Sequence, residues 1–514
     1  MQTLQDNYKA YKKGEKIEAL FLFQAGTVWA SMESVYESCK QDGRFDVKLV
    51  WVEDTTVETS HMVTAKEFLN EKRLPYVRYE EVKWEEYCPH IVFIQFPYDV
   101  ACHTPETLSI QFRARGCRVI YIPYGIEISD TQIARKDHFH NFVVENSWRV
   151  YTCCDGMKEE YNMYCRNRKA VRVTGSPKFD AITYKEKLPL KDEIVKGADG
   201  KKVVVWKMHF PKKIVENGVI KQITPFMSEY IEFAQKMNQY KDLFFIVLAH
   251  PKMLKGIVAS DCQGDETMMQ QVKQLMKILS TKDNVYIDTD DDYRNSFYHA
   301  DVIVMDRSAV MIEAAMLDVP ILLMKNTDYS ESMTKPVQYI VDSFEQGTCC
   351  KDIQNFILKI CSGIDDKAEI RRQRIKETFP FNDGLCGERI KEDIVDGLMK
   401  EEKKASQVIL YGTGEVCRYY LERQKWNNNI EFEVVAIVDS NSAKWGESFY
   451  GRTIISPYSI KELDFDAIVI MTEVHYFEIK KALVYDLYLD ERKIWRLDEF
   501  VLQLGEIEAW QKNI

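Results

Sequence analysis

Long apolar runs are missing from this chain of 514 residues. No window comes near the roughly 18 to 20 consecutive apolar residues that a membrane-spanning helix needs. The first residues, MQTLQDNYKAYKKGEK, are too polar for a signal peptide. We therefore expect a cytoplasmic protein, which reaches the inner face of the cell membrane only by peripheral attachment or through a partner enzyme.

Metal-type cysteine spacing and a basic charge balance are missing as well. The 13 cysteines contain no C-x-x-C pair, and the adjacent pairs Cys153-Cys154 and Cys349-Cys350 are poor geometry for zinc or a disulfide framework. We interpret them as reduced thiols and expect no metal site. The net charge of −11, without a basic stripe that carries aromatics, argues against nucleic-acid binding.

The sequence does contain three groups of short apolar strands that alternate with helical segments. An apolar content of 46% is ample for globular folding, and the length exceeds what one hydrophobic core supports. Alternating strands and helices predict an α/β fold with parallel sheets covered on both faces. We expect Rossmann-like domains at residues 1–184, 203–400 and 406–514, with the charged segment 185–202 as a linker.

The segment 293–324 concentrates the chemistry of the second domain. It predicts a buried strand at 302–305, a turn at Asp306 and a helix over about 308–317. Backbone N–H groups at a helix N-terminus hold phosphate, so Ser308 and Ala309 are candidates for that task, and Glu313 would reach ribose hydroxyls. The alternative is that Ser308 only caps the helix and that Glu313 is solvated.

Two histidines also follow predicted strands of the second domain. His250 precedes a proline that ends the strand, which places the imidazole where it would stabilise a departing diphosphate, although a lone histidine is more often structural. His209 follows another strand, and a solvated basic turn is its favoured interpretation. A solvated loop is likewise favoured over a cation site for the nearby acidic run of Asp288, Asp290, Asp291 and Asp292.

The third domain begins with a partial dinucleotide-binding fingerprint. Gly412 and Gly414 lie between a predicted strand and a helix, and Asp439 ends the next strand. In the full pattern the glycines let the backbone approach a pyrophosphate and the acid meets a ribose. Cys417 replaces the last glycine. A bound nucleotide is therefore one interpretation, and a structural or regulatory use is the favoured one.

Three short motifs occur in a recognisable order: TGSPKFD at 174–180, AHP at 249–251 and ADVIVMDRSAVMIEAAMLDVPILLM at 300–324. Together they resemble the signatures of the CDP-glycerol glycerophosphotransferase family, which builds teichoic-acid and capsule polymers. The resemblance covers about residues 90–345. It implies a GT-B pair of domains, with the donor bound by the second domain and the acceptor by the first.

The resemblance also implies site residues. Lys178 takes the place of the family's arginine as a phosphate cation, whereas Arg307 and Ala309 depart from the family's tyrosine and second serine. A CDP-activated polyol would be the donor substrate, with no cofactor required. The implied donor-binding residues are Lys178, His250, Asp306, Ser308, Ala309 and Glu313.

The first domain departs from the family at the candidate base. Tyr124-Gly125 stands where the family has His-Gly, and a tyrosine of ordinary pKa is a poor base at neutral pH. Either Glu127 or Asp130 takes that role, the acceptor differs, or the fold persists without this activity. We favour a carboxylate base, with His250 acting at the leaving group.

These observations predict a transferase. It would move a glycerol-phosphate or related polyol-phosphate group from a CDP-activated donor to a hydroxyl of a polyol-phosphate, glycan or lipid-linked acceptor in cell-surface polymer biosynthesis. One alternative is a GT-B glycosyltransferase that uses a nucleotide-diphosphate sugar. Another is a non-catalytic scaffold that binds nucleotides or partner enzymes. Donor hydrolysis separates the scaffold from the enzymes, and donor identity separates the two enzymes.

Overall fold

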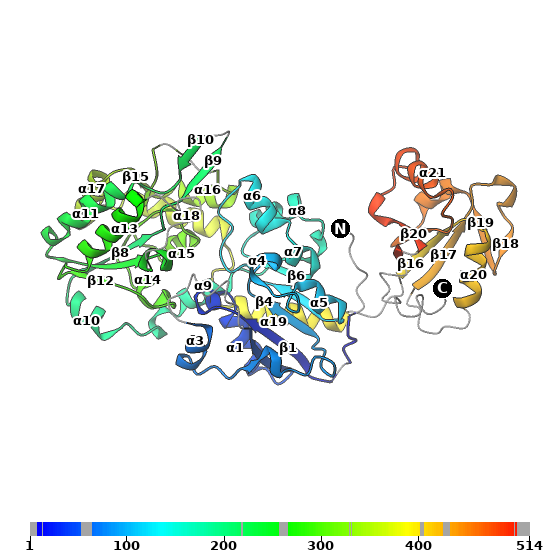
Figure 1. Cartoon of the computed structure of the whole chain (residues 1–514), viewed down its shortest axis with the longest axis horizontal. Coiled ribbons are helices and arrows are strands. Elements are labelled where there is room, and N and C mark those ends of the chain that lie inside the picture. The colour runs from blue at the N-terminus through cyan, green and yellow to red at the C-terminus, as the bar shows by residue number, and fades with distance from the viewer. Residues whose placement is uncertain are drawn as a thin grey trace. The chain divides into compact units, whose positions relative to one another are not determined.

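The computed structural model describes residues 8–12, 14–52, 64–216, 219–255, 266–327, 329, 332–400, 406–424, 432–497 and 499–500. The chain forms two compact units, Tyr8–Asp396 and a smaller unit that contains Gly397–Ile514. Figure 1 shows the helices and strands of both. The larger unit holds two parallel sheets, which we call the first half and the second half.

The first half is built on seven parallel strands in the order β3-β2-β1-β4-β5-β6-β7. The order reverses between β1 and β4, and such a switch point opens a crevice at the carboxyl ends of the strands. The strands are β1 Ile17–Phe23, β2 Phe45–Trp51, β3 Val77–Arg78, β4 Ile91–Ile94, β5 Arg118–Tyr121, β6 Ser147–Thr152 and β7 Val171–Val173.

Helices lie between these strands, and the turn after β1 is held close to one of them. A Cβ atom on Gly26 would lie 2.3 Å from the Phe68 ring, so only glycine fits there. This contact fixes the start of the 3-10 helix Gly26–Ser31, which carries Thr27. The helices of this half are α1 Glu33–Gln41, α3 Ala65–Glu71, α4 Asp99–Cys102, α5 Ser109–Ala114, α6 Gln132–Ala134, α7 Phe142–Asn146, α8 Asp155–Tyr164 and α9 Pro177–Thr183.

The second half has six parallel strands in the order β12-β11-β8-β13-β14-β15, with its switch point between β8 and β13. β11 is buried along its whole length, as expected for a central parallel strand. The strands are β8 Lys202–Met208, β11 Leu243–Ala249, β12 Val285–Ile287, β13 Val302–Met305, β14 Ile321–Met324 and β15 Glu345–Gly347, and a separate antiparallel hairpin joins β9 Lys213–Glu216 to β10 Val219–Gln222.

The last helix of this region returns to the first half. The backbone N–H groups of Cys386 and Gly387 each donate to the Asp180 carboxylate at 2.9 Å, and Asp393 accepts from the Tyr151 hydroxyl at 2.8 Å. The helices of the second half are α10 Asp192–Ala198, α11 Met227–Lys236, α12 Pro251–Leu254, α13 Glu266–Leu279, α14 Arg294–Phe297, α15 Met311–Met316, α16 Lys335–Val341, α17 Cys350–Cys361, α18 Ala368–Thr378 and α19 Cys386–Lys400.

The segment 185–202, which was predicted to be a linker, contains a docked helix. Seven of its residues form α10, and Ile194 on this helix is fully buried. A Cβ atom on Gly197 would lie 2.2 Å from the Phe244 ring in β11. One buried isoleucine and one close glycine contact are enough to dock a helix that is otherwise mostly polar.

The smaller unit contains a third sheet in the order β18-β19-β17-β16-β20-β21, in which only β18 runs antiparallel. Three mostly parallel sheets confirm the predicted α/β class. The elements are β16 Ser406–Tyr411, α20 Glu415–Gln424, β17 Phe432–Val438, β18 Ser448–Phe449, β19 Arg452–Ile455, β20 Ala467–Ile470, α21 Tyr476–Lys481 and β21 Ile494–Arg496.

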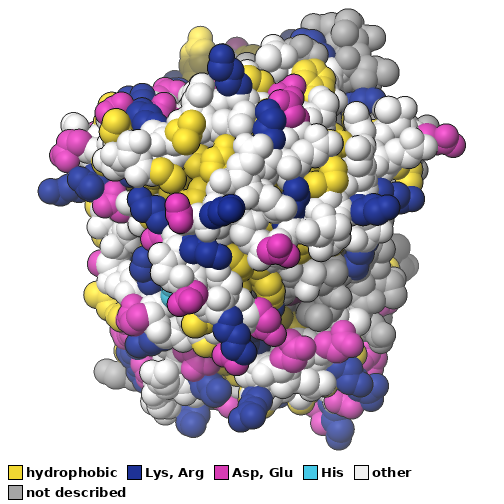
Figure 2. Space-filling view, turned by 90° about the vertical axis from the view of Figure 1, so that its left-hand side faces the viewer, with side chains coloured by type: hydrophobic (Ala, Val, Ile, Leu, Met, Phe, Trp, Pro, Cys, Tyr) yellow, Lys and Arg dark blue, Asp and Glu magenta, His cyan; other side chains and the backbone are white. Residues whose placement is uncertain are grey.

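The surface carries charges of both signs. On the face turned toward the viewer in Figure 2, Lys and Arg side chains are interspersed with Asp and Glu side chains. Within the described ranges, no helix combines the length and the apolar character that a membrane crossing requires.

Candidate functional site

Polar residues gather at the carboxyl edge of the second sheet. His209 follows β8, His250 follows β11 and Asp306 follows β13. The strand register pairs Lys207 with Met305 on one side, and Met208 with Ala249 on the other. The three strand ends are therefore neighbours at the switch point of this half, where open parallel sheets bind ligands.

Asp306 is fully buried, and its side chain stabilises this edge of the sheet. Its carboxylate accepts the backbone N–H of His209 at 2.8 Å and the Tyr230 hydroxyl at 2.9 Å. Burial raises the pKa of Asp306, and these two hydrogen bonds oppose that shift. The side chain thus ties the end of β8 to the turn after β13. Its predicted contact with a donor remains a prediction.

Lys207 is a candidate that sequence reasoning missed. It lines a cavity of about 110 Å³ at the sheet edge, together with Thr27 from the first half. Burial lowers the pKa of the Lys207 ammonium to about 8, and the negative charge of Asp306 opposes this shift. The second lysine of the strand KVVVWKM follows four apolar residues and is the signal that would have identified it, because an ammonium group in a central strand needs a polar partner.

The same cavity is lined by acidic side chains. Asp288 accepts the Ser296 hydroxyl and lies 3.5 Å from Lys191, which also lies 3.4 Å from Asp290. Carboxylates of this kind accept hydrogen bonds from hydroxyl groups. The remaining lining residues are Leu248, Ala249, Pro251, Leu254, Thr289, Asp291, Tyr293 and Val310.

The acidic run from Asp288 to Asp292 is therefore not the solvated loop predicted from the sequence. Asp292 is held by Arg294 at 2.7 Å, and Arg294 also pairs with Glu33 of the first half. The prediction was wrong because the neighbouring buried Arg294 and the distant Lys72 and Lys191, both partly exposed, pair with the carboxylates of the run. Three of its side chains are at most 4% exposed: Asp288, Asp291 and Asp292.

His250 has a defined orientation at the start of α12. Its Nδ1 atom accepts the backbone N–H of Lys252 at 3.2 Å and so caps this short helix. An accepting Nδ1 leaves Nε2 as the protonated nitrogen of the neutral ring. The ring lies 4.7 Å from the Phe210 ring and 5.3 Å from the His209 ring, measured between centroids. In this tautomer Nε2–H is the hydrogen-bond donor of the His250 ring.

The turn after β13 differs from the predicted helix start. α15 begins at Met311, and residues 308–310 form a turn ahead of it. The Ser308 hydroxyl accepts the Val310 N–H at 3.4 Å, and this local hydrogen bond competes with helix formation. A Cβ atom on Gly125 would lie 3.1 Å from Ala309, so the turn meets the first half here.

Lys178 and Glu313 contact each other. The Lys178 ammonium lies 2.6 Å from the Glu313 carboxylate, and the two side chains are 5% and 0% exposed. The other carboxylate oxygen accepts the hydroxyls of Tyr293 at 2.7 Å and Tyr298 at 2.6 Å. Glu313 is thus not solvated. The pair joins α9 of the first half to α15 of the second, and its predicted contacts with a donor stay untested.

The first half faces this edge with aromatic side chains. The hydroxyls of Tyr98 and Tyr124 are 3.0 Å apart, and the Tyr98 ring packs against His138. Burial raises the pKa of Tyr124 and lowers that of His138. The positive charge of Arg307 acts to lower both pKa values. Arg307 also lowers the pKa of His209, where burial is the larger cause. Its guanidinium therefore influences both halves.

The two carboxylates proposed as bases have different surroundings. Asp130 is held by Arg135 at 2.7 Å and 3.0 Å. Glu127 is buried, accepts the Tyr161 hydroxyl, and has its pKa raised to about 7 by burial. Its backbone carbonyl accepts the Thr334 hydroxyl of the second half at 2.9 Å. Glu127 lines a separate small pocket, and its raised pKa is the property that would suit a base at neutral pH.

The glycine turn of the smaller unit has the predicted strand, turn and helix around it. Gly412 has a φ of +106°, and a Cβ atom on Gly414 would meet nothing within 4 Å. Asp439 accepts the Thr413 N–H at 3.2 Å and pairs with Lys444 at 2.8 Å. The acid thus holds the turn itself, and its predicted contact with a nucleotide remains a prediction.

Two switch points joined by a cavity define the class of the larger unit, which has the GT-B fold. A putative UDP-N-acetylglucosamine 2-epimerase from Listeria monocytogenes is 12% identical, with a TM-score of 0.51 over 75% of this chain and 98% of that chain. This likeness confirms the predicted fold class.

Two further solved structures are similar at lower scores. S. aureus MnaA with UDP is 14% identical, with a TM-score of 0.48 over 74% of this chain and 97% of that chain. The wall teichoic acid polymerase TagF is 13% identical, with a TM-score of 0.47 over 77% of this chain and 91% of that chain. Residues 404–495 match the family described as C2185-like, N-terminal. No curated protein matches the chain.

Proposed function

We propose that the chain is a transferase that moves a glycerol-phosphate or related polyol-phosphate group from a CDP-activated donor to a hydroxyl acceptor in cell-surface polymer biosynthesis. The observation that carries the proposal is the cavity of about 110 Å³ at the carboxyl edge of the second sheet, which combines the Lys207 ammonium with carboxylates. A diphosphate needs the cation, and polyol or ribose hydroxyls need the acceptors.

The reaction would be an attack of the acceptor hydroxyl on the donor's outer phosphorus. A new phosphorus–oxygen bond forms, the bond to the bridging oxygen breaks, and CMP leaves. Lys207 and the Nε2–H of His250 would stabilise the charge that grows on the departing phosphate. Neither group needs to move a proton for this task. No cofactor takes part in the proposed step.

Glu127 is the base that we propose for the acceptor hydroxyl. Its raised pKa of about 7 fits proton transfer at neutral pH, whereas the Asp130 carboxylate already binds the Arg135 guanidinium. The Tyr98 and Tyr124 hydroxyls would orient the acceptor from the first half. The acceptor itself would be a polyol-phosphate, a glycan or a lipid-linked chain, which the protein reaches at the inner membrane face by peripheral attachment.

The test is release of CMP from CDP-glycerol by the full chain with a glycerol-phosphate acceptor. We expect turnover with the wild type and a loss of at least about tenfold in Lys207→Met, because one charge-assisted contact contributes about 1.5–3 kcal/mol. Lys241→Met is the matched control, since Lys241 is an exposed lysine of the same half. Turnover of UDP-sugars in place of CDP-glycerol would refute the proposed donor, and full activity of Lys207→Met would refute the proposed site.

A further inference from the structure

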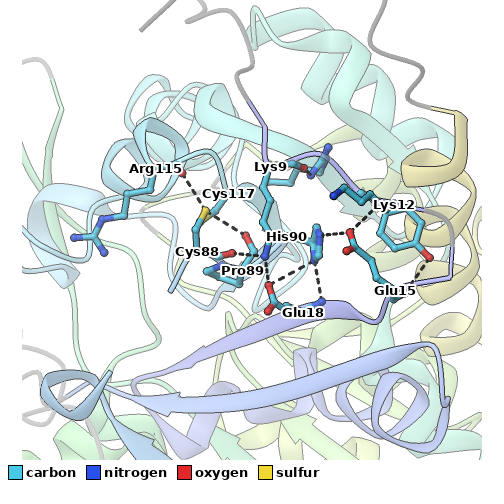
Figure 3. Close-up of polar contacts among 11 residues, drawn as sticks. Lys9, Lys12, Glu15, Glu18, Cys88, Pro89, His90, Arg115 and Cys117 are labelled. Atoms are coloured by element: carbon cyan, nitrogen blue, oxygen red, sulfur yellow. Dashed lines mark hydrogen bonds and ion pairs between the residues drawn. The ribbon is translucent and has the colours of Figure 1, made fainter. Parts of the chain in front are cut away.

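Two thiols meet at the amino edge of the first sheet, the edge opposite to the candidate site. Cys88 lies just ahead of β4 and Cys117 directly precedes β5. These strands are paired, and the Arg118 N–H donates to the His90 carbonyl at 3.0 Å. The two sulfur atoms are 3.6 Å apart. Figure 3 shows both cysteines beside Arg115, Pro89 and Lys9.

This separation is short enough for a bond to form with small side-chain rotations. A disulfide has a sulfur–sulfur distance of about 2.05 Å. Each sulfur therefore has to move by less than about 1 Å if both rotate toward one another. The Cys88 thiol also donates to the Arg115 carbonyl at 3.0 Å, which holds its sulfur on the side of Cys117.

The surroundings of the two thiols differ in a way that suits oxidation. Cys88 is partly exposed and Cys117 is buried. A hydrogen bond from Cys117 lowers the pKa of Cys88 to about 7, and the charges of Lys9 and Arg115 act in the same direction. Lys9 is held in place because its ammonium donates to the Cys88 carbonyl at 2.9 Å and pairs with Glu18. The exposed sulfur is therefore the nucleophile.

We propose that Cys88 and Cys117 form an oxidation site at which a hydroperoxide converts the two thiols into a reversible disulfide. The Cys88 thiolate attacks one oxygen atom of the peroxide, and the oxygen–oxygen bond breaks. Hydroxide departs, and Cys88 becomes a sulfenic acid. The Cys117 sulfur then attacks the Cys88 sulfur, the sulfur–sulfur bond forms, and water leaves. Two thiols and one hydrogen peroxide thus give one disulfide and two waters, and a dithiol reductant reverses the change.

The disulfide would cross-link the loop ahead of β4 to the residue that precedes β5. It would act where the N-terminal segment is anchored, since the Lys9 N–H donates to the Gly116 carbonyl at 2.8 Å. The cavity near Lys207 lies at the opposite sheet edges. Oxidation is therefore expected to raise the melting temperature without changing nucleotide binding, which separates this proposal from the proposed function.

The experiment treats the full chain with hydrogen peroxide and maps its peptides by mass spectrometry without reduction. We expect a cross-link between the peptides that contain Cys88 and Cys117, with a mass loss of about 2 Da that dithiothreitol reverses. Cys88→Ser should abolish this cross-link. Cys361→Ser is the matched control, because Cys361 is exposed and lies on α17, and it should leave the cross-link intact.

A further variant tests the order of the two steps. In Cys117→Ala the second thiol is gone, so a dione reagent should trap the sulfenic acid on Cys88. Circular dichroism checks that this variant is folded, and if it is not, the comparison of wild type with Cys88→Ser decides alone. The proposal is overturned if Cys88 and Cys117 stay unlinked at peroxide doses that oxidise Cys361.

Discussion

Lys178 and Glu313 illustrate how single residues act in this chain. Each was predicted from its motif to bind the donor. In the structure the two side chains are buried and contact each other at 2.6 Å. A buried ion pair is costly to form, and it is costlier to break on one side because the remaining charge has no partner. The pair therefore positions α9 against α15, and the donor contacts predicted for both residues stay a prediction.

The pair makes a stability prediction. Lys178→Met should lower the free energy of unfolding by about 3–5 kcal/mol, because Glu313 keeps a buried charge without its cation. The double variant Lys178→Met with Glu313→Gln should recover part of that loss, since glutamine still accepts the tyrosine hydroxyls. Guanidinium denaturation measures both. Equal losses in the single and the double variant would show that the two charges are not coupled.

The lowered pKa of Lys207 predicts that nucleotide binding depends on pH. Its ammonium form attracts a diphosphate, and its pKa is lowered to about 8, so the charge is present below that pH and is lost above it. Nucleotide-diphosphate affinity should therefore fall as the pH rises through about 8. Calorimetric titration with CDP-glycerol between pH 6.5 and 9.5 measures this trend. In Lys207→Met the affinity should be weaker and flat, and an unchanged slope in that variant would remove Lys207 from the site.

At the scale of elements, the strand ends and short turns of the second half build the candidate site. α12 depends on the His250 side chain as its cap, and α15 starts only after the turn at 308–310. Both helices are too short to form on their own, so tertiary contacts hold them. A change at either turn can thus alter the site geometry as well as remove a functional group.

Two substitutions at His250 separate these effects. His250→Ala should reduce turnover severely and lose the cap, which is worth about 0.5–2 kcal/mol. His250→Asn keeps a capping side chain, so we expect a normal melting temperature with turnover still severely reduced. Ser308→Ala should impair turnover only modestly. Melting curves and CMP release measure the three variants, and near-normal turnover of His250→Asn would exclude the imidazole from the reaction.

The sequence predicts the elements better than it predicts the pairing of their side chains. The strands and the GT-B halves follow from apolar runs and from the order of the motifs. Lys178 and Glu313 are 135 positions apart, and no local pattern announces that they meet. The turn at Ser308 was predicted as helix because its residues permit both, and the local hydrogen bond to Val310 decides between them.

At the scale of the whole molecule, the candidate chemistry belongs to the larger unit. Its two switch points meet at a cavity that Thr27 of the first half shares with Lys207 of the second. The smaller unit has its own glycine turn, in which Asp439 and Lys444 hold Thr413. A nucleotide in that unit is a separate proposal, and a panel of nucleotides applied to the full chain examines both units at once.

The most direct test of the central claim is a thermal-shift panel on the full chain and on Lys207→Met. It compares CDP-glycerol and CDP-ribitol with UDP-sugars and NAD(P), since a ligand that binds only the folded state raises the melting temperature. We predict that a CDP-activated polyol raises the melting temperature of the wild type and not that of Lys207→Met. A panel in which no nucleotide raises the melting temperature would contradict the account.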